Sequence, residues 1–182
     1  MNKIKGVMKN RDLVFIDTET TGLNLQNELL QIAVIRVKSD DFSILDEWSV
    51  KIKPRHIENA DPEALKVNGY NEEEWRNAVD IEQALDMFNE KTKDAVPVGH
   101  NLPFDLFFLK KELNKYDRDA TFFYHGLDTV SLAWQELKNV QEVERFSLNE
   151  LARYFKIGQP NAHDALADAK TTYQLFLKLD EQ

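Results

Sequence analysis

The stretch that decides the fold reads VFIDTETTGL and covers residues 14–23. Its apolar start and the turn signal at Gly22 are typical of a short strand that is buried on both faces. Side chains alternate along a strand, so Asp17 and Glu19 are expected on one side of the sheet and Thr18 on the other. The stretch therefore predicts a core strand that ends in a pair of neighbouring carboxylates.

This acidic pair predicts a cation site. Asp17 and Glu19 would repel each other, and both are costly to desolvate at the end of an apolar strand. A divalent cation would remove that cost, and oxygen ligands suit Mg²⁺ or Mn²⁺. Gly22 then leaves backbone free for the close approach of a ligand. The alternative, which this stretch alone leaves open, is that the two acids simply begin a solvated loop.

Two more strands are expected directly after this one, which itself covers about residues 12–19. Residues 29–37 are almost continuously apolar, and residues 42–53 follow a turn signal. Short connections between three successive strands indicate an antiparallel meander. Pro54 is expected to end it.

Residues 55–80 are expected to be irregular, with short helical pieces. Asp61 as N-cap and Pro62 as the first helical residue predict the start of one piece. Asn71 is expected to cap a second piece over residues 72–74, whose acids suit the N-terminus of a helix.

From residue 80 onward, helices and strands alternate. Apolar residues at 81, 84, 85 and 88 have the spacing of an amphipathic helix. The elements expected after it are a strand at 95–98, a helix that Asn101 caps and Pro103 begins, a strand at 121–127, a helix at 129–137, a short helix begun by a capping box of Ser147 and Glu150, and a helix at 164–179. A meander followed by this alternation predicts one mixed sheet covered by helices, which is an α/β domain.

Length and composition limit the kind of protein. The chain has 182 residues, no cysteine and a net charge of −9. We expect a single domain over residues 12–182 after a flexible lead-in over residues 1–11, without disulfides or thiolate metal sites. No apolar run has the length of a membrane span and no signal core is found, so a cytoplasmic protein without a membrane partner is expected. The charge argues against coating nucleic acid, but allows a grip on a few nucleotides at an end.

Two further acids and a histidine lie near expected element ends. Asp105 falls in the first turn of a helix, where it either joins the acidic pair or only favours the helix dipole. His163 and Asp168 are five residues apart, which is about 140° around a helix, so they converge only if His163 lies in the loop before it. Asp164 competes with Asp168 for the site, but we expect it to cap the helix. A loop histidine is either a mobile base or merely solvent-exposed.

Three stretches of the sequence resemble a known family. They are DTETTG at residues 17–22, GHNLPFD at 99–105 and HDALADA at 163–169. In this order they are similar to the three motifs of the DEDD 3′–5′ exonucleases, and the histidine five residues before the last acid resembles the DEDDh, or DnaQ-like, branch. That branch takes its name from the proofreading exonuclease of bacterial DNA polymerase III. The resemblance implies a ribonuclease-H-like fold: a five-stranded mixed sheet, with a meander of three strands plus two parallel strands, flanked by helices.

The resemblance also implies a reaction and its cofactors. Two Mg²⁺ or Mn²⁺ ions would be held by Asp17, Glu19, Asp105 and Asp168, and His163 would take a proton from the attacking water. The expected reaction removes nucleoside 5′-monophosphates from the 3′ end of single-stranded nucleic acid, with DNA as the expected substrate and short RNA or RNA 3′ ends as the alternative. A DNA polymerase is a candidate partner. The rival from another class is a non-catalytic, polymerase-associated binding subunit.

The same resemblance suggests residues that hold the terminal nucleotide. Thr20, Gly22 and Leu23 are expected against its sugar and base. His100 either contacts phosphate or is a hydrogen-bonded turn histidine, Asn101 is expected as helix cap and pocket wall, and Phe104 either stacks or packs in the core. Basic residues that could contact phosphates further along the strand, or form a solvated strand face, are Lys51, Lys53 and Arg55.

Overall fold

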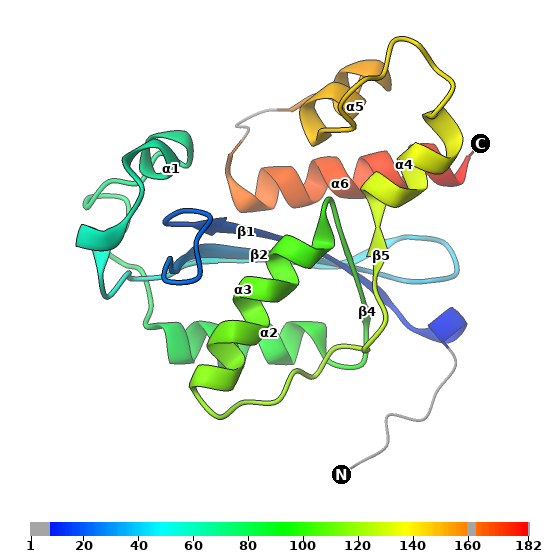
Figure 1. The fold of residues 1–182 in the computed structure, drawn as a ribbon. Coiled ribbons are helices and arrows are strands. Elements are labelled where there is room, and N and C mark those ends of the chain that lie inside the picture. The colour runs from blue at the N-terminus through cyan, green and yellow to red at the C-terminus, as the bar shows by residue number, and fades with distance from the viewer. Residues whose placement is uncertain (1–7, 160–162, 182) are drawn as a thin grey trace.

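A five-stranded mixed sheet forms the centre of the molecule, with helices on both faces (Figure 1). The computed structural model describes residues 8–159 and 163–181. The strands lie in the order β3-β2-β1-β4-β5, with bounds β1 Leu13–Thr20, β2 Leu29–Val37, β3 Ile44–Lys51, β4 Val96–Gly99 and β5 Leu127–Asp128. The first three strands are antiparallel neighbours, while β4 is parallel to β1 and β5 is parallel to β4. The expected meander of three strands plus two parallel strands is confirmed.

Six α-helices and two short 3₁₀ helices are assigned in the described residues. Their bounds are η1 Met8–Asn10, η2 Ile57–Asn59, α1 Pro62–Val67, α2 Ile81–Thr92, α3 Leu102–Lys115, α4 Thr129–Leu137, α5 Leu148–Tyr154 and α6 Ala165–Asp180. Helices α2 and α3 cover one face of the sheet and α6 covers the other, with α4 and α5 beyond it (Figure 1). Within residues 8–159 and 163–181, no helix combines the length and the apolar character needed to cross a membrane.

The alternation of side chains along β1 divides the core into two layers. Val14 and Ile16 pack with residues of α2 and α3 in one cluster. Phe15 points to the opposite face, where it packs with Ala169 and Phe176 of α6. Because both faces are covered, every residue of β1 up to Ile16 is apolar and buried.

The parallel strands open a site at their carboxyl end. The pairing of β4 with β1 covers only residues 13–15 of β1, so residues 16–20 extend beyond β4. The chain then turns at His100 and Asn101 and enters α3, which starts beside that extension. In open α/β sheets, ligands bind outside the carboxyl ends of the strands where neighbouring connections diverge, and β1 lies at such a point between β2 and β4.

Two predicted elements are wrong. The strand expected at 121–127 is reduced to β5, Leu127–Asp128. Phe122 and Phe123 pack into the core from an irregular segment, whose backbone joins the sheet region only through single bonds such as Phe123 N–H to Ala95 O. These two residues are apolar because they are buried, and not because they belong to a hydrogen-bonded strand. The helical piece expected at 72–74 is a turn, in which the Asn71 side chain accepts from the Glu74 N–H across 2.9 Å.

Two capping predictions also need correction. Asn101 holds the N-cap position of α3, but in a left-handed conformation with φ 64° and without a side-chain cap bond, so Pro103 is the second helical residue. Ser147 caps α5 as expected, by accepting from the Glu150 N–H. The Glu150 carboxylate does not complete a capping box, because it accepts from the N–H groups of Glu144 and Arg145 instead.

The described part of the expected lead-in is packed against the domain. Residues 1–7 lie outside the described residues, whereas Met8 contacts the core cluster beside α6. Arg11 donates to the Asp94 carbonyl across 2.8 Å. Met8 and Arg11 of the expected lead-in thus contact the domain.

Candidate active site

Three carboxylates from two elements meet beside the open end of β1. Carboxylate oxygens of Asp17 and Glu19 on β1 and of Asp168 on α6 all lie within 4.8 Å of one another. Asp17 and Glu19 share the face of Phe15, which is the face that α6 covers. Asp168 lies in the first turn of α6, which brings its carboxylate next to theirs. The strand and the helix therefore assemble the predicted acidic group from residues that are far apart in the sequence.

Asp105 approaches the same end of β1 from the other face. It lies in the first turn of α3, is buried, and accepts a hydrogen bond of 2.7 Å on Oδ1 from the hydroxyl of Thr18. Thr18 points away from Asp17, toward the face that α3 covers. Asp105 is outside the set of three carboxylates within 4.8 Å, but its charge raises the pKa of Asp17. All four predicted acids thus influence one small region.

The electrostatics of this region favour protonation or a cation. Burial raises the pKa of Asp17 well above its ordinary value, and the charges of Asp105 and Asp168 raise it further. Burial also raises the pKa of Glu19 to about 8, with the charges of Asp168 and Asp164 adding to the effect. For Asp105 and Asp168, burial is again the main cause of a raised pKa. Clustered carboxylates in this state fit divalent cations, because a cation offsets both the desolvation and the mutual repulsion.

His163 lies in the segment before α6, as the spacing required. It is exposed, adopts a left-handed conformation with φ 71°, and donates its backbone N–H to Oδ2 of Asp168 across 3.1 Å. Residues 160–162 of the expected loop lie outside the described residues. The bond to Asp168 holds the histidine backbone next to the acidic group while its side chain faces solvent.

Asp164 has the capping role that we expected. Its Oδ1 accepts from the Ala167 N–H across 3.1 Å at the start of α6. Its Oδ2 accepts from Nε2 of Gln31 across 3.0 Å. Gln31, which none of the sequence motifs includes, is buried on β2 directly opposite Glu19. The available signal was an amide within a strand whose only other polar residue is Arg36.

The segment after the acidic pair is held by its own polar groups. The Thr20 hydroxyl donates to the Gly22 carbonyl across 2.8 Å. Gly22 has φ 149°, and a Cβ there would come within 2.7 Å of Oδ1 of Asn27. The group that comes close to the backbone of Gly22 is therefore the side chain of Asn27, and not a ligand as the sequence suggested. Leu23 follows with 79% of its surface exposed, which leaves its side chain free to meet a ligand.

The three candidates around the turn before α3 have different environments. Nδ1 of His100 lies 2.9 Å from Oγ1 of Thr129 and Nε2 lies 3.0 Å from the Phe146 carbonyl, while burial lowers the pKa of His100. This geometry favours the hydrogen-bonded turn histidine over a phosphate contact. Asn101 is exposed beside it. The ring of Phe104 packs against Phe108, with centroids 5.1 Å apart, and lies against the core.

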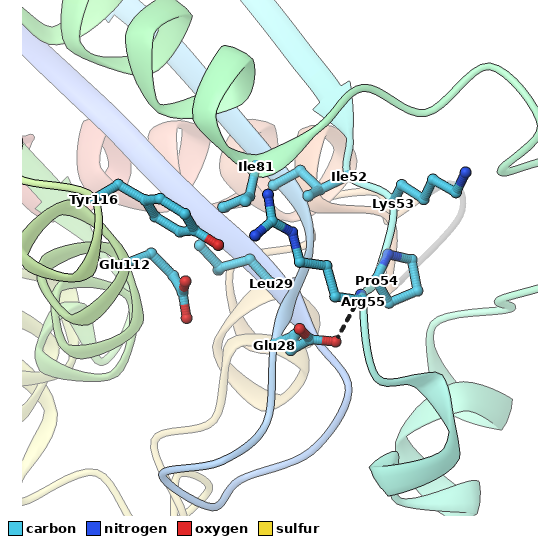
Figure 2. Close-up of a pocket in the computed structure, with 9 residues that line it drawn as sticks. All are labelled: Glu28, Leu29, Ile52, Lys53, Pro54, Arg55, Ile81, Glu112 and Tyr116. Atoms are coloured by element: carbon cyan, nitrogen blue, oxygen red, sulfur yellow. Dashed lines mark hydrogen bonds between the residues drawn. The ribbon is translucent and has the colours of Figure 1, made fainter.

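The three basic candidates on and after β3 are mostly engaged with acids. Lys51 pairs with Glu74 and Arg55 with Glu82, both across 2.9 Å. Arg55 and Lys53 line a pocket with Tyr116 (Figure 2), but its volume of about 10 Å³ leaves room for about one water molecule at most. These pairings favour the solvated-face interpretation for Lys51 and Arg55.

Comparison with known proteins gives a family match. The sequence matches the RNase_T family, described as exonuclease, over residues 14–176. A DNA polymerase III of the PolC type from Caldanaerobacter subterraneus subsp. tengcongensis is 32% identical over 175 residues. That alignment covers 94% of this chain but only 12% of the polymerase, so the chain spans a small part of the length of this relative.

Solved structures share the fold. E. coli Exonuclease I in complex with a dT13 oligonucleotide has a TM-score of 0.79 at 21% identity, over 93% of this chain and 41% of that one. The nuclease domain of 3′hExo, a DEDDh family member bound to rAMP, has a TM-score of 0.76 at 12% identity, over 97% of this chain and 94% of that one. The likeness confirms the ribonuclease-H-like fold that the motifs implied.

Proposed function

This chain belongs to the RNase_T exonuclease family, and on that premise we propose that it hydrolyses single-stranded DNA from the 3′ end with divalent cations. The observation that carries the proposal is the group of three carboxylates, Asp17, Glu19 and Asp168, within 4.8 Å of one another at the end of β1. A binding protein has no need of clustered acids with raised pKa values, so the intact group argues against the non-catalytic rival.

The four acids provide the donors for the cations. Asp17, Glu19 and Asp168 would hold one Mg²⁺ or Mn²⁺ ion, and Asp105, on the other side of β1, would contribute to a second. When bound, two cations would stabilise the attacking and leaving oxygens of the phosphodiester and make a water molecule easier to deprotonate. The protein contributes oxygen ligands that are held on a strand and two helix starts, which keeps them in place before substrate arrives.

His163 is the proposed general base. Its side chain is exposed, next to Asp168, and histidine as a residue type exchanges protons near neutral pH. It would accept a proton from the water that attacks the terminal phosphorus. The bond from phosphorus to the 3′ oxygen of the preceding nucleotide breaks, and that oxygen takes up a proton. The products are a nucleoside 5′-monophosphate and a strand one nucleotide shorter.

The segment after the acidic pair is the proposed site for the terminal nucleotide. Leu23 is exposed beside the acids and offers an apolar surface for a base or sugar. Thr20 and Gly22 bond to each other and fix the backbone under it. Asn101 and Phe104 lie at the start of α3 beside Asp105, and we propose them as the opposite wall, with Phe104 acting mainly through packing.

Two observations bear on the nucleic acid. DNA is favoured because the relatives that match over most of this chain are DNA polymerases. The same relatives make a DNA polymerase a proposed partner or neighbouring domain, and a cytoplasmic location follows from that proposal. RNA is the second candidate, because the DEDDh nuclease domain with the same fold was solved with rAMP.

Product analysis on matched oligonucleotides tests the proposal. Single-stranded DNA and RNA of one sequence, labelled at the 5′ end, would be incubated with Mg²⁺ and with Mn²⁺. We expect ladders that shorten from the 3′ end, with DNA cut faster, and chromatography of the released, unlabelled nucleotides should identify nucleoside 5′-monophosphates. A blocked 3′ hydroxyl serves as the control and should stop attack. Internal fragments from the blocked strand would identify an endonuclease and overturn the proposal, and faster cutting of RNA would select the second candidate.

A further inference from the structure

The loop between β1 and β2 has an exposed tip. Residues 23–26 are all exposed, including Leu25 with 70% of its surface accessible. The tip buries no apolar side chain that would fix its position. Its place beside the acidic group must therefore be set by polar contacts on either side of it.

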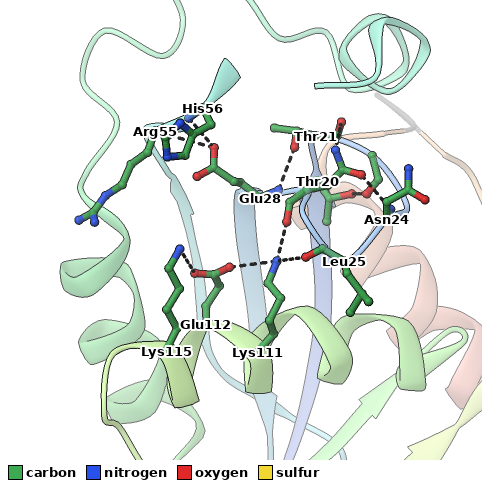
Figure 3. Close-up of polar contacts among 12 residues, drawn as sticks. Thr20, Thr21, Asn24, Leu25, Glu28, Arg55, His56, Lys111, Glu112 and Lys115 are labelled. Carbon is green, nitrogen blue, oxygen red and sulfur yellow. Dashed lines mark hydrogen bonds and ion pairs between the residues drawn. The ribbon is translucent and has the colours of Figure 1, made fainter. Parts of the chain in front are cut away.

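One side of the loop is held by the segment between β3 and α1, which includes η2. Asn27 is buried and donates through Nδ2 to the carbonyls of Thr21 and Asn59, across 3.2 and 3.4 Å. Oε2 of Glu28 accepts the backbone N–H groups of Arg55 and His56, across 3.0 and 2.9 Å (Figure 3). These contacts fix the base of the loop.

The other side is held by one lysine from α3. Nζ of Lys111 donates to the carbonyl oxygen of Leu25 across 3.3 Å and to that of Asn27 (Figure 3). It also lies 3.0 Å from Oε1 of Glu112. The ammonium group thus donates to two carbonyl oxygens of the loop and pairs its charge with one carboxylate. Lys111 is therefore a fixed connection and not a freely moving surface lysine.

The buried neighbour keeps this lysine in position. Glu112 has a side chain that is only 5% exposed, and it pairs with Lys111 and, at 3.7 Å, with Lys115. A buried carboxylate requires a cation beside it, so the charge of Lys111 is retained at the loop. Lys115 pairs with the same carboxylate, but among the described residues it makes no hydrogen bond to the loop. It is therefore a matched control for Lys111.

From these contacts we infer that Lys111 is a positioning residue that connects the Asp105 helix to the loop that receives the terminal nucleotide. This inference rests on the proposed function. Lys111 lies on α3 six residues after Asp105. Its bond to Leu25 therefore fixes the loop tip to the helix that carries one of the proposed cation ligands. Its polar partners in the described structure are the two loop carbonyls and Glu112, and none of them is a proposed cation ligand. Its loss should therefore weaken the capture of a 3′ end and leave the hydrolysis step nearly unchanged.

Kinetics with matched variants test the inference. Lys111→Met keeps the length of the side chain and removes the ammonium group, and Lys115→Met is the control. On a single-stranded oligonucleotide we expect KM to rise about tenfold in Lys111→Met, with kcat changed less than about twofold. Lys115→Met should retain both values. Lys111→Arg, which keeps a cationic donor, should recover part of the loss.

Hydrogen exchange provides a readout that does not depend on activity. The amides of Asn24 and Asn27 are both bonded within the loop and report its order. We expect faster exchange of these two amides in Lys111→Met and no change in Lys115→Met. The double variant Lys111→Met with Glu112→Gln removes the stranded carboxylate and should show the same loop exchange, in case the single variant is poorly folded.

The outcomes separate this inference from the proposed function. If the wild type degrades no oligonucleotide, the proposed function fails, and the exchange experiment still tests whether Lys111 orders the loop. If the wild type is active but Lys111→Met retains both KM and loop exchange, the positioning role is wrong. A fall of kcat with unchanged KM would also contradict it, because that result assigns Lys111 to the chemical step.

Discussion

The hydroxyl of Thr18 donates a hydrogen bond of 2.7 Å to Oδ1 of Asp105 and so joins β1 to the first turn of α3. Successive side chains of β1 point to opposite faces of the sheet, and this alternation explains how four acids from three elements come together. Asp17 and Glu19 face α6 and meet Asp168, while the intervening Thr18 faces α3 and holds Asp105. The contact is buried, so its loss has consequences for both stability and metal binding.

Replacing Thr18 by valine tests this connection. Thr18→Val keeps the shape of the side chain but leaves Asp105 without its hydroxyl donor, which should lower the free energy of unfolding by about 1–3 kcal/mol. It should also weaken Mg²⁺ binding measured by calorimetry, because Asp105 is no longer oriented. Thr92→Val is the control, since Thr92 is a buried threonine whose hydroxyl bonds to the Phe88 carbonyl far from the acids. Equal effects of the two variants on Mg²⁺ affinity would refute a specific role for Thr18.

Gln31 supports the start of α6 and should influence turnover. In Gln31→Leu, Asp164 loses the amide that orients it, and the segment with His163 and the helix start with Asp168 become less fixed. We expect kcat on single-stranded DNA to fall about tenfold, since a small misplacement of catalytic groups is costly. Gln159→Leu removes an exposed amide contact to Asn149 and should not change kcat. Unchanged turnover in Gln31→Leu would show that Asp164 needs no such partner.

The raised pKa values predict an unusual dependence of stability on pH. Burial raises the pKa of Glu19 to about 8 and also raises that of Asp17, so the folded protein keeps protons that the unfolded chain releases above about pH 4. Between about pH 4 and about pH 8, unfolding therefore releases protons from these carboxyl groups. The stability of the metal-free protein should consequently fall as pH rises from about 5 to about 8. Calorimetric scans in EDTA should show a decrease of Tm of several degrees, which Mg²⁺ reduces by replacing the protons.

Glu19→Gln provides the control for this pH series. The variant lacks the carboxylate with the raised pKa, so its Tm in EDTA should fall less steeply over the same range. A metal-free wild type whose Tm rises between about pH 5 and about pH 8 would contradict the assignment of raised pKa values to these acids.

We predict that Asp128 stabilises the fold, as the N-cap of α4, and takes no part in cleavage. Its Oδ1 accepts from the N–H groups of Val130 and Ser131 and so caps α4. Asp128→Ala should lower the free energy of unfolding by about 1 kcal/mol, as loss of an N-cap does. Chemical denaturation measures that change, and Mg²⁺-dependent cleavage should persist at temperatures below the transition. Lost cleavage with unchanged stability would instead assign Asp128 to the reaction.

Much of this arrangement was predictable from the sequence, for identifiable reasons. The strand at residues 29–37 matched β2 at both ends, because an almost continuously apolar run of this length between turn signals is typical of a buried strand. The expected helix at 129–137 also matched α4. The spacing between His163 and Asp168 required His163 to precede the helix, and α6 does begin after it.

What was not predictable depends on tertiary contacts. Phe122 and Phe123 have the composition of a strand, but they are buried without strand pairing. Gln31 and Thr18 acquire their roles only from the side chains that packing brings opposite them. Asn101 has the identity of a helix cap, yet its left-handed conformation directs its side chain away from that role. Local sequence gives no information about such partners.

The substitution Asp17→Asn tests the central claim, that partly buried, mutually repelling acids form a cation-dependent nuclease site. Thermal unfolding and cleavage of a 5′-labelled oligonucleotide would be measured on the same samples, in EDTA and in Mg²⁺. Because the variant relieves repulsion, we predict a Tm in EDTA equal to or above that of the wild type, a reduced rise of Tm with Mg²⁺, and loss of Mg²⁺-dependent cleavage. Normal Mg²⁺-dependent cleavage by Asp17→Asn would contradict the account.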